Sequence, residues 1–187
     1  MSEIRRVAVL VGSLRKESLN RKLANALVRL AARTLAMEIV EIGDLPLYNQ
    51  DLENPAPAAW TRFRDVVRAA DAVLFVTPEY NRSVPGLLKN AIDVASRPYG
   101  HNAWNGKPGA IVSASPGAMG AFGANHHLRQ ALVFVNVPVM AQPEAYIGHA
   151  GELFDERGEF KSEGTREFLT AFVAAFGVWI EKTRPTA

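Results

Sequence analysis

The sequence contains no cysteine among its 187 residues. Because the chain has no thiol, it forms no disulfide, no thiolate metal cluster and no cysteine nucleophile, and the enzyme classes built on these groups are excluded. The histidines His101, His126, His127 and His149 include no pair at the i, i+4 spacing of a helical zinc site and no His-Glu-x-x-His context. We therefore expect no bound metal.

The sequence also lacks an apolar run long enough to cross a bilayer. Its first residues, Met-Ser-Glu-Ile-Arg-Arg, lead directly into the first predicted strand, without the hydrophobic region of a secretory signal. These features predict a cytoplasmic protein without a membrane partner.

Dense runs of lysine and arginine are missing as well. The 21 basic residues nearly balance the 19 acidic residues, for a formal net charge of +2, so we expect no nucleic-acid partner. Hydrophobic residues make up 48% of the chain, which is enough for a sizeable core. Length and composition together predict one globular domain that spans residues 1–187.

Two common phosphate-binding motifs, Gly-x-Gly-x-x-Gly and Gly-x-x-x-x-Gly-Lys-Ser/Thr, are absent. What the sequence does contain is an apolar run at residues 7–11 that predicts a buried strand. The run stops at Gly12, and a polar stretch then leads into an amphipathic helical pattern from Leu19. Unpaired N–H groups in such a loop and in the first helical turn, together with the helix dipole, predict an anion site.

The side chains of this loop suit a terminal monophosphate. Ser13, Ser18 and Asn20 offer short donors, and Arg15 adds a fixed charge. In a second interpretation the loop is an ordinary turn, and Ser18 merely caps the helix at Leu19. Both interpretations fit the loop taken by itself.

Further along the chain, buried strands alternate with one-sided helices. Strands are expected at residues 7–11, 37–42, 71–77, 109–113 and 137–141, and helices from 19 to about 31, after Pro55 and Pro57, and at 87–96, 127–134 and 167–182. The last helix places Phe168, Phe172, Phe176 and Trp179 along one side, and residues 143–161 are expected to form a long polar excursion. This alternation predicts an α/β fold in which helices cover both faces of a five-stranded parallel sheet.

Ligands of such sheets bind at the carboxyl ends of the strands. Three unusual loops, at residues 12–20, 78–86 and 114–123, each follow a predicted strand. We therefore expect the three loops to gather along one edge of the sheet, where a single pocket can use them all.

The residues of these loops resemble the NADPH-dependent FMN reductase family of flavodoxin-like proteins. The resemblance rests on Gly12-Ser13-Leu14-Arg15-Lys16-Glu17-Ser18-Leu19-Asn20, then Pro78-Glu79-Tyr80-Asn81, then Ser115-Pro116-Gly117-x-x-Gly120. It covers nearly the whole chain, and within the family the likeness is greatest to bacterial quinone and chromate reductases, which are similar to azoreductases. It implies a flavodoxin-like fold.

The resemblance also implies bound FMN and assigns residues to it. Ser13, Arg15, Ser18, Leu19 and Asn20 correspond to the phosphate loop, Pro78, Glu79, Tyr80 and Asn81 to the turn along the isoalloxazine, and Ser115, Pro116 and Gly117 to the turn at the pyrimidine edge. From the residues alone, other roles stay open. Glu79 is then a solvated acid, Tyr80 a packing residue, and the glycines of the third loop form a flexible turn.

The activity that the resemblance implies is a two-step exchange: NADH or NADPH delivers a hydride to the flavin, and an acceptor then takes the electrons. Quinones are the expected acceptors, with chromate, ferric complexes and azo compounds as permissive ones. No catalytic side chain is expected, since the flavin carries the chemistry. The rival is a flavodoxin-like electron carrier, although a net charge of +2 lacks the acidic field that such carriers use for docking. A hydrolase or regulatory nucleotide-binding domain on the same sheet is a third possibility.

The family resemblance further implies homodimers, often paired into homotetramers, with the helix after the Pro-Glu-Tyr-Asn turn in the interface. That helix and its approach carry Val84, Leu87, Leu88, Ala91 and Ile92. Alternatively, these apolar residues simply fill the core.

Overall fold

The computed structural model of the chain describes residues 4–31 and 34–184. The other residues of the predicted domain, 1–3, 32–33 and 185–187, lie outside the described residues. The strands and α-helices are β1 (Arg5–Val11), α1 (Leu19–Ala31), β2 (Leu35–Val40), α2 (Ala58–Ala69), β3 (Ala72–Thr77), α3 (Gly86–Ala95), β4 (Gly109–Ala114), α4 (Phe122–Phe134), β5 (Ala145–Ile147) and α5 (Glu163–Thr183). Short 3-10 helices lie at Gln50–Leu52 and Ala150–Glu152.

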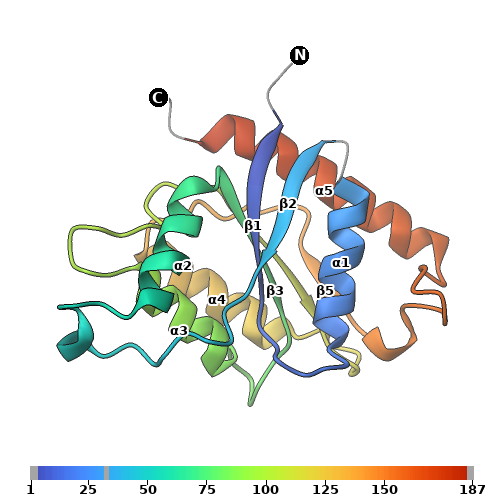
Figure 1. The fold of residues 1–187 in the computed structure, drawn as a ribbon. Coiled ribbons are helices and arrows are strands. Elements are labelled where there is room, and N and C mark those ends of the chain that lie inside the picture. The colour runs from blue at the N-terminus through green and yellow to red at the C-terminus, as the bar shows by residue number, and fades with distance from the viewer. Residues whose placement is uncertain (1–3, 32–33, 185–187) are drawn as a thin grey trace.

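The five strands form one sheet in the order β2-β1-β3-β4-β5, and every pairing is parallel. This order, in which the second strand lies outside the first, is that of flavodoxin-like doubly wound sheets. The predicted fold class is therefore confirmed (Figure 1).

Helices cover both faces of the sheet, because successive strand residues point to opposite sides. Val7, Val9 and Val11 belong to a core cluster shared with α1 and α5. Leu10 and Phe75 belong to the opposite cluster, shared with α2, α3 and α4. Figure 1 shows the two layers, with α1 and α5 on one side of the strands.

The last helix is longer than predicted, and its buried side is displaced. It begins at Glu163 because the Ser162 hydroxyl oxygen caps it, accepting a hydrogen bond from the Thr165 N–H at 3.3 Å. Phe172 and Phe176 are buried as predicted, but Phe168 is 36% exposed. Leu169, Val173 and Ile180 complete the buried stripe instead.

The first four predicted strands are confirmed to within two residues at each end, but the fifth is wrong. Residues 137–141 make only an isolated bridge, Gly109 to Val139, and β5 lies inside the predicted excursion. Gly109 of β4 pairs with Val139, and Val112 pairs with Ala145. The segment beside β4 therefore uses six residues where β4 uses three, so it contains an insertion. The inserted residues include Pro143, which has no N–H to donate, so the strand is split.

Candidate functional site

The three unusual loops meet at the carboxyl edge of the sheet, at the bottom of Figure 1. The Gly12 N–H donates to the Val76 carbonyl at 2.9 Å, which joins the first loop to the end of β3. Asn20 donates through Nδ2 to the Ala114 carbonyl at 3.1 Å, which joins α1 to the start of the third loop. The structure therefore brings the sequence-predicted loops together in one place.

In the first loop, Ser13, Ser18 and Asn20 are buried and Arg15 is exposed. The Ser18 Oγ accepts a hydrogen bond from the Arg21 N–H at 3.1 Å, so Ser18 caps α1, as the second interpretation predicted. This cap does not exclude a ligand, because a hydroxyl whose oxygen accepts still has its hydrogen to donate. The Ser13 Oγ accepts from the Arg15 N–H at 3.4 Å and keeps the loop folded back on itself.

The second loop is a tight reversal of the chain. Tyr80 and Ser83 exchange two backbone hydrogen bonds, of 3.0 and 2.9 Å, and the two residues between them have positive φ, 51° at Asn81 and 65° at Arg82. Asparagine tolerates the left-handed region better than most residues, which suits it to this turn. Tyr80 is 49% exposed, so it is not a core packing residue.

Glu79 turns away from solvent and caps a distant helix. Its side chain is 15% exposed, and Oε2 accepts a hydrogen bond from the Ala124 N–H, in the first turn of α4, at 3.0 Å. The expectation of a solvated acid is therefore wrong for the carboxylate. This contact also explains why α4 starts at Phe122, five residues before the predicted 127, since the cap comes from another loop.

The third loop is packed rather than free. The Ser115 N–H donates to the Ile147 carbonyl at 3.1 Å, and the Gly117 N–H donates to Ser115 Oγ at 3.1 Å. Gly120 has φ +57°, and a Cβ there would lie 2.6 Å from the Tyr146 carbonyl carbon. Only glycine fits that approach, so the loop has a fixed shape on β5. Pro116 and Gly117 are exposed.

The family model of the NADPH-dependent FMN reductases matches residues 5–152 of this chain. The chain belongs to this family. A quinone reductase of Pseudomonas putida is 63% identical over 185 residues, which cover 98% of this chain and 99% of that protein. A 2-hydroxy-1,4-benzoquinone reductase of a Burkholderia species is 45% identical over 179 residues, with 96% and 98% covered.

Among solved structures, the flavoenzyme NAD(P)H:(acceptor) oxidoreductase FerB of Paracoccus denitrificans matches with a TM-score of 0.93 at 49% identity, covering 97% of this chain and 100% of that one. These findings confirm the family resemblance and the expectation of an enzyme. They also confirm FMN as the cofactor and NAD(P)H as the co-substrate of this FMN reductase.

One buried atom gives a test of whether the predicted residues fit FMN. Asn20 is 4% exposed, and its Oδ1 has no hydrogen-bond partner within residues 4–31 and 34–184. A buried acceptor without a donor costs roughly 1–3 kcal/mol, so such an atom points to a ligand that donates. A ribityl hydroxyl is a donor of this kind. The hydroxyls of Ser13 and Ser18, the cationic side chain of Arg15 and the N-terminus of α1 suit the phosphate group of the same ligand.

The sequence prediction assigns no site role to three residues that lie next to the third loop of this FMN reductase, and it overlooks Tyr146 altogether. Phe122 and His126 are exposed near the start of α4, and Tyr146 lies on β5 beside them. Burial, with a smaller contribution from the Glu144 carboxylate, raises the pKa of Tyr146 to about 12. Only the true start of α4 reveals that Phe122 and His126 share a helical face at i, i+4 spacing.

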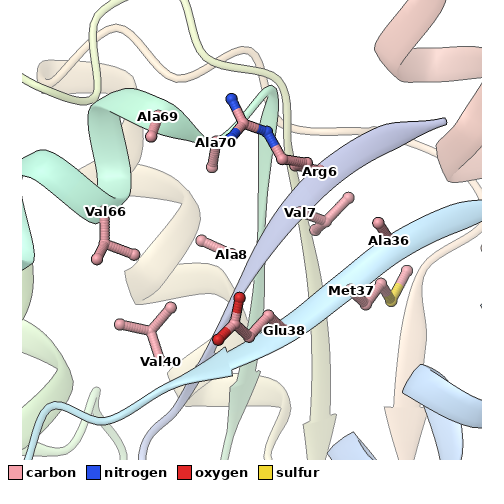
Figure 2. A pocket seen from close by; sticks show the side chains of 10 residues that line it. All are labelled: Arg6, Val7, Ala8, Ala36, Met37, Glu38, Val40, Val66, Ala69 and Ala70. Atoms are coloured by element: carbon pink, nitrogen blue, oxygen red, sulfur yellow. The ribbon is translucent and has the colours of Figure 1, made fainter. Parts of the chain in front are cut away.

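In the part of the chain that the structure describes, no cluster of three or more His, Cys, Asp or Glu residues could hold a metal ion. No helix within the described ranges combines the length and the apolar character that spanning a membrane requires. A cavity of about 430 Å³ lies between α2 and the strands β1 and β2, lined by alanines and valines with Arg6, Met37 and Glu38 (Figure 2), and none of the predicted cofactor residues lines it.

Proposed function

We propose that this chain is an FMN-dependent NAD(P)H oxidoreductase that reduces quinones through its bound flavin. The observation that carries the proposal is the convergence of the three loops at one edge of the sheet, with the buried Asn20 Oδ1 left without a partner among the described residues. The names of the relatives support the acceptor, because a quinone reductase is 63% identical and a 2-hydroxy-1,4-benzoquinone reductase 45% identical.

The three loops have separate roles in binding. Ser13, Arg15, Ser18, Leu19 and Asn20 hold the phosphate and the start of the ribityl chain. Pro78, Glu79, Tyr80 and Asn81 form the turn along the ring, with the backbone as the contacting part and the Glu79 carboxylate as its anchor on α4. Ser115, Pro116 and Gly117 border the pyrimidine edge, where a small exposed turn lets backbone donors approach a flat ring.

When bound in these loops, FMN would supply the redox chemistry that connects NAD(P)H with the acceptor. The protein's part is to bind and orient. Large apolar side chains are exposed on the loops at this edge: Leu14 by 63%, Tyr80 by 49% and Met119 by 61%. This apolar rim favours a flat, uncharged acceptor, so quinones are the main substrates and chromate, ferric complexes and azo compounds permissive ones.

The competing function is an electron carrier without its own NAD(P)H oxidation. The net charge of +2 argues against it, since carriers of this kind dock through a strongly acidic surface. The second loop does hold one hydroxyl and imidazole pair, since the Ser83 Oγ lies 3.0 Å from the His127 Nδ1. The family match favours a flavin enzyme over a hydrolase.

We also propose that the protein is a cytoplasmic homodimer or homotetramer, and a continuous groove between α3 and α4 supports the association. Two hollows of about 370 and 350 Å³ share Lys89 and Ala131, and Phe134 borders one of them with 89% of its surface exposed. Leu88, Ala91 and Ile92 fill the core, as the alternative for this helix predicted, so the association surface is the groove and not the buried face of α3.

The deciding experiment combines spectrum and turnover. Freshly purified protein is expected to be yellow and to release FMN on denaturation, and to oxidise NADH or NADPH with 1,4-benzoquinone as acceptor. FMN binding without turnover of any quinone would instead favour the electron-carrier function. A colourless protein that binds no added FMN would sink the proposal altogether.

A further inference from the structure

An aromatic patch lies beside the third loop and has no role in binding FMN as described above. It consists of Phe122 and His126 on α4 and Tyr146 on β5. The ring centroid of Phe122 lies 4.2 Å from that of His126 and 5.3 Å from that of Tyr146, so the three rings form one continuous surface. Phe122 is 43% exposed, and an exposed aromatic cluster on a soluble protein marks a contact surface.

The orientation of the His126 ring is fixed by a hydrogen bond. Its Nε2 lies 2.9 Å from the Tyr146 hydroxyl oxygen, and the two ring planes are within 18° of parallel. The hydroxyl also has the Glu144 carboxylate as a partner, and Arg129 is the cation near it. The hydrogen bond to Tyr146 therefore holds the His126 ring in one orientation beside Phe122.

The patch is attached to the same loops that are assigned to FMN. Gly120 of the third loop packs on the Tyr146 backbone, and the Glu79 carboxylate of the second loop holds the first turn of α4, where Phe122 lies. The aromatic patch thus adjoins the loops assigned to FMN, and the exposed Met119 lies next to it, since its carbonyl accepts a hydrogen bond from the Phe122 N–H at 3.1 Å.

We propose that the aromatic patch binds the ring system of aromatic quinone acceptors, with Tyr146 as the positioning residue for His126. This inference rests on the proposed function, because it assigns the acceptor specificity of that enzyme. A flat π system gains ring-to-ring contact on Phe122 and His126, whereas an acceptor without a ring gains nothing there. The patch therefore separates acceptors by aromaticity and leaves the NAD(P)H step unchanged.

The test uses the FMN-loaded protein and the variants Phe122→Leu, His126→Leu and Tyr146→Phe, with Phe168→Leu and Tyr99→Phe as controls at exposed positions on other elements. Loss of either aromatic ring is expected to raise KM for 1,4-naphthoquinone about five- to tenfold. KM for ferricyanide, which has no ring, and the rate at which NADH reduces the protein are expected to stay within about twofold.

A binding measurement without turnover provides the second readout. The Kd of the redox-inert naphthalene-2-sulfonate for the oxidised protein is expected to rise by the same factor as KM in Phe122→Leu and His126→Leu. Tyr146→Phe keeps the ring, so it is expected to raise KM without lowering kcat and to shift the NMR signals of the His126 imidazole. The controls are expected to match the wild type.

The outcomes separate this inference from the function on which it rests. A wild-type protein that reduces quinones, with variants whose naphthoquinone KM and naphthalene-2-sulfonate Kd equal its own, overturns the aromatic patch alone. An equal rise in KM for naphthoquinone and ferricyanide overturns it too, because the effect is then not specific to rings. A wild-type protein that reduces no quinone overturns both proposals.

Discussion

A single carboxylate links the second predicted cofactor loop to the first turn of α4. Ala121, which precedes α4, has φ +62° and no capping side chain, so the helix lacks an N-cap of its own. Glu79 supplies the missing acceptor from 45 residues away. Gly123 leaves room for it, since a Cβ there would lie 2.9 Å from Glu79 Oε2 and 3.0 Å from the Arg82 carbonyl oxygen. The shape of the second loop and the start of α4 therefore depend on each other.

Two substitutions of Glu79 distinguish the effect of its hydrogen bond to α4 from the effect of its negative charge. Glu79→Ala leaves the Ala124 N–H without its acceptor, and by analogy with N-cap deletions we expect a loss of about 1 kcal/mol in the free energy of unfolding, with weaker FMN binding. Glu79→Gln keeps a carbonyl acceptor of the same length and is expected to recover most of both. Urea unfolding and FMN titration measure the two effects. Equal losses in the two variants would show that charge and not capping matters.

Tyr146 makes stability depend on pH in the alkaline range. Its pKa is raised from 10 to about 12 by burial first and by Glu144 second, so the folded protein holds a proton that the unfolded chain releases. The resulting stabilisation is complete below pH 10 and is lost as the pH rises toward 12. Tyr146→Phe is expected to lose less stability than the wild type between pH 9 and pH 11.5 in urea unfolding. Tyr99→Phe, at an exposed position, is the control, and a variant curve parallel to the wild type would contradict the assignment.

At the scale of elements, the sequence predicts those strands and helices whose positions follow from their own pattern of buried residues. The first four strands are apolar runs covered on both faces, so their pattern alone locates them, and the parallel topology then gathers the three loops at one edge. The start of α4 and the split fifth strand escape prediction because a distant carboxylate and an insertion at Pro143 determine them. For the same reason Phe122, His126 and Tyr146 are invisible as a group until the chain is folded.

A buried ion pair anchors α2 to the adjoining loop and to α3. The Arg64 guanidinium bonds both oxygens of Glu53, at 2.8 and 3.2 Å, donates to the Val94 carbonyl at 2.9 Å and lies 5.5 Å from the Trp60 ring centroid. The Arg64 side chain is only 5% exposed. A cation so buried depends on its partner, because removing one member of a buried pair leaves an uncompensated charge.

Glu53→Leu is accordingly expected to lower the free energy of unfolding by about 3–5 kcal/mol. Asp44→Leu, which breaks the exposed pair with Arg62, is the matched control and is expected to cost less than about 1 kcal/mol. Urea unfolding of both variants measures the contrast. A similar small loss in both would mean that water reaches Arg64 when Glu53 is gone.

At the scale of the whole molecule, the two faces of the sheet differ in what they leave exposed. The layer of α2, α3 and α4 ends in a groove, beside which Val133 is 74% and Phe134 89% exposed. Large apolar side chains exposed to solvent favour association, and a groove that accepts them on the same face allows two copies to pair about a two-fold axis. This is where we expect the subunits to meet.

The groove makes the oligomer sensitive to one charge. Phe134→Glu places a carboxylate in the expected contact, and a central apolar anchor is worth about 2 kcal/mol or more, so association is expected to weaken at least about thirtyfold. Light scattering across a dilution series then gives a smaller mass for the variant than for the wild type at equal concentration. Val178→Glu, at a 54% exposed position on α5 across the sheet, is expected to keep the wild-type mass. If both variants keep it, the subunits do not meet at α3 and α4. If both lose it, the added charge acts through general destabilisation, which urea unfolding of the two variants detects.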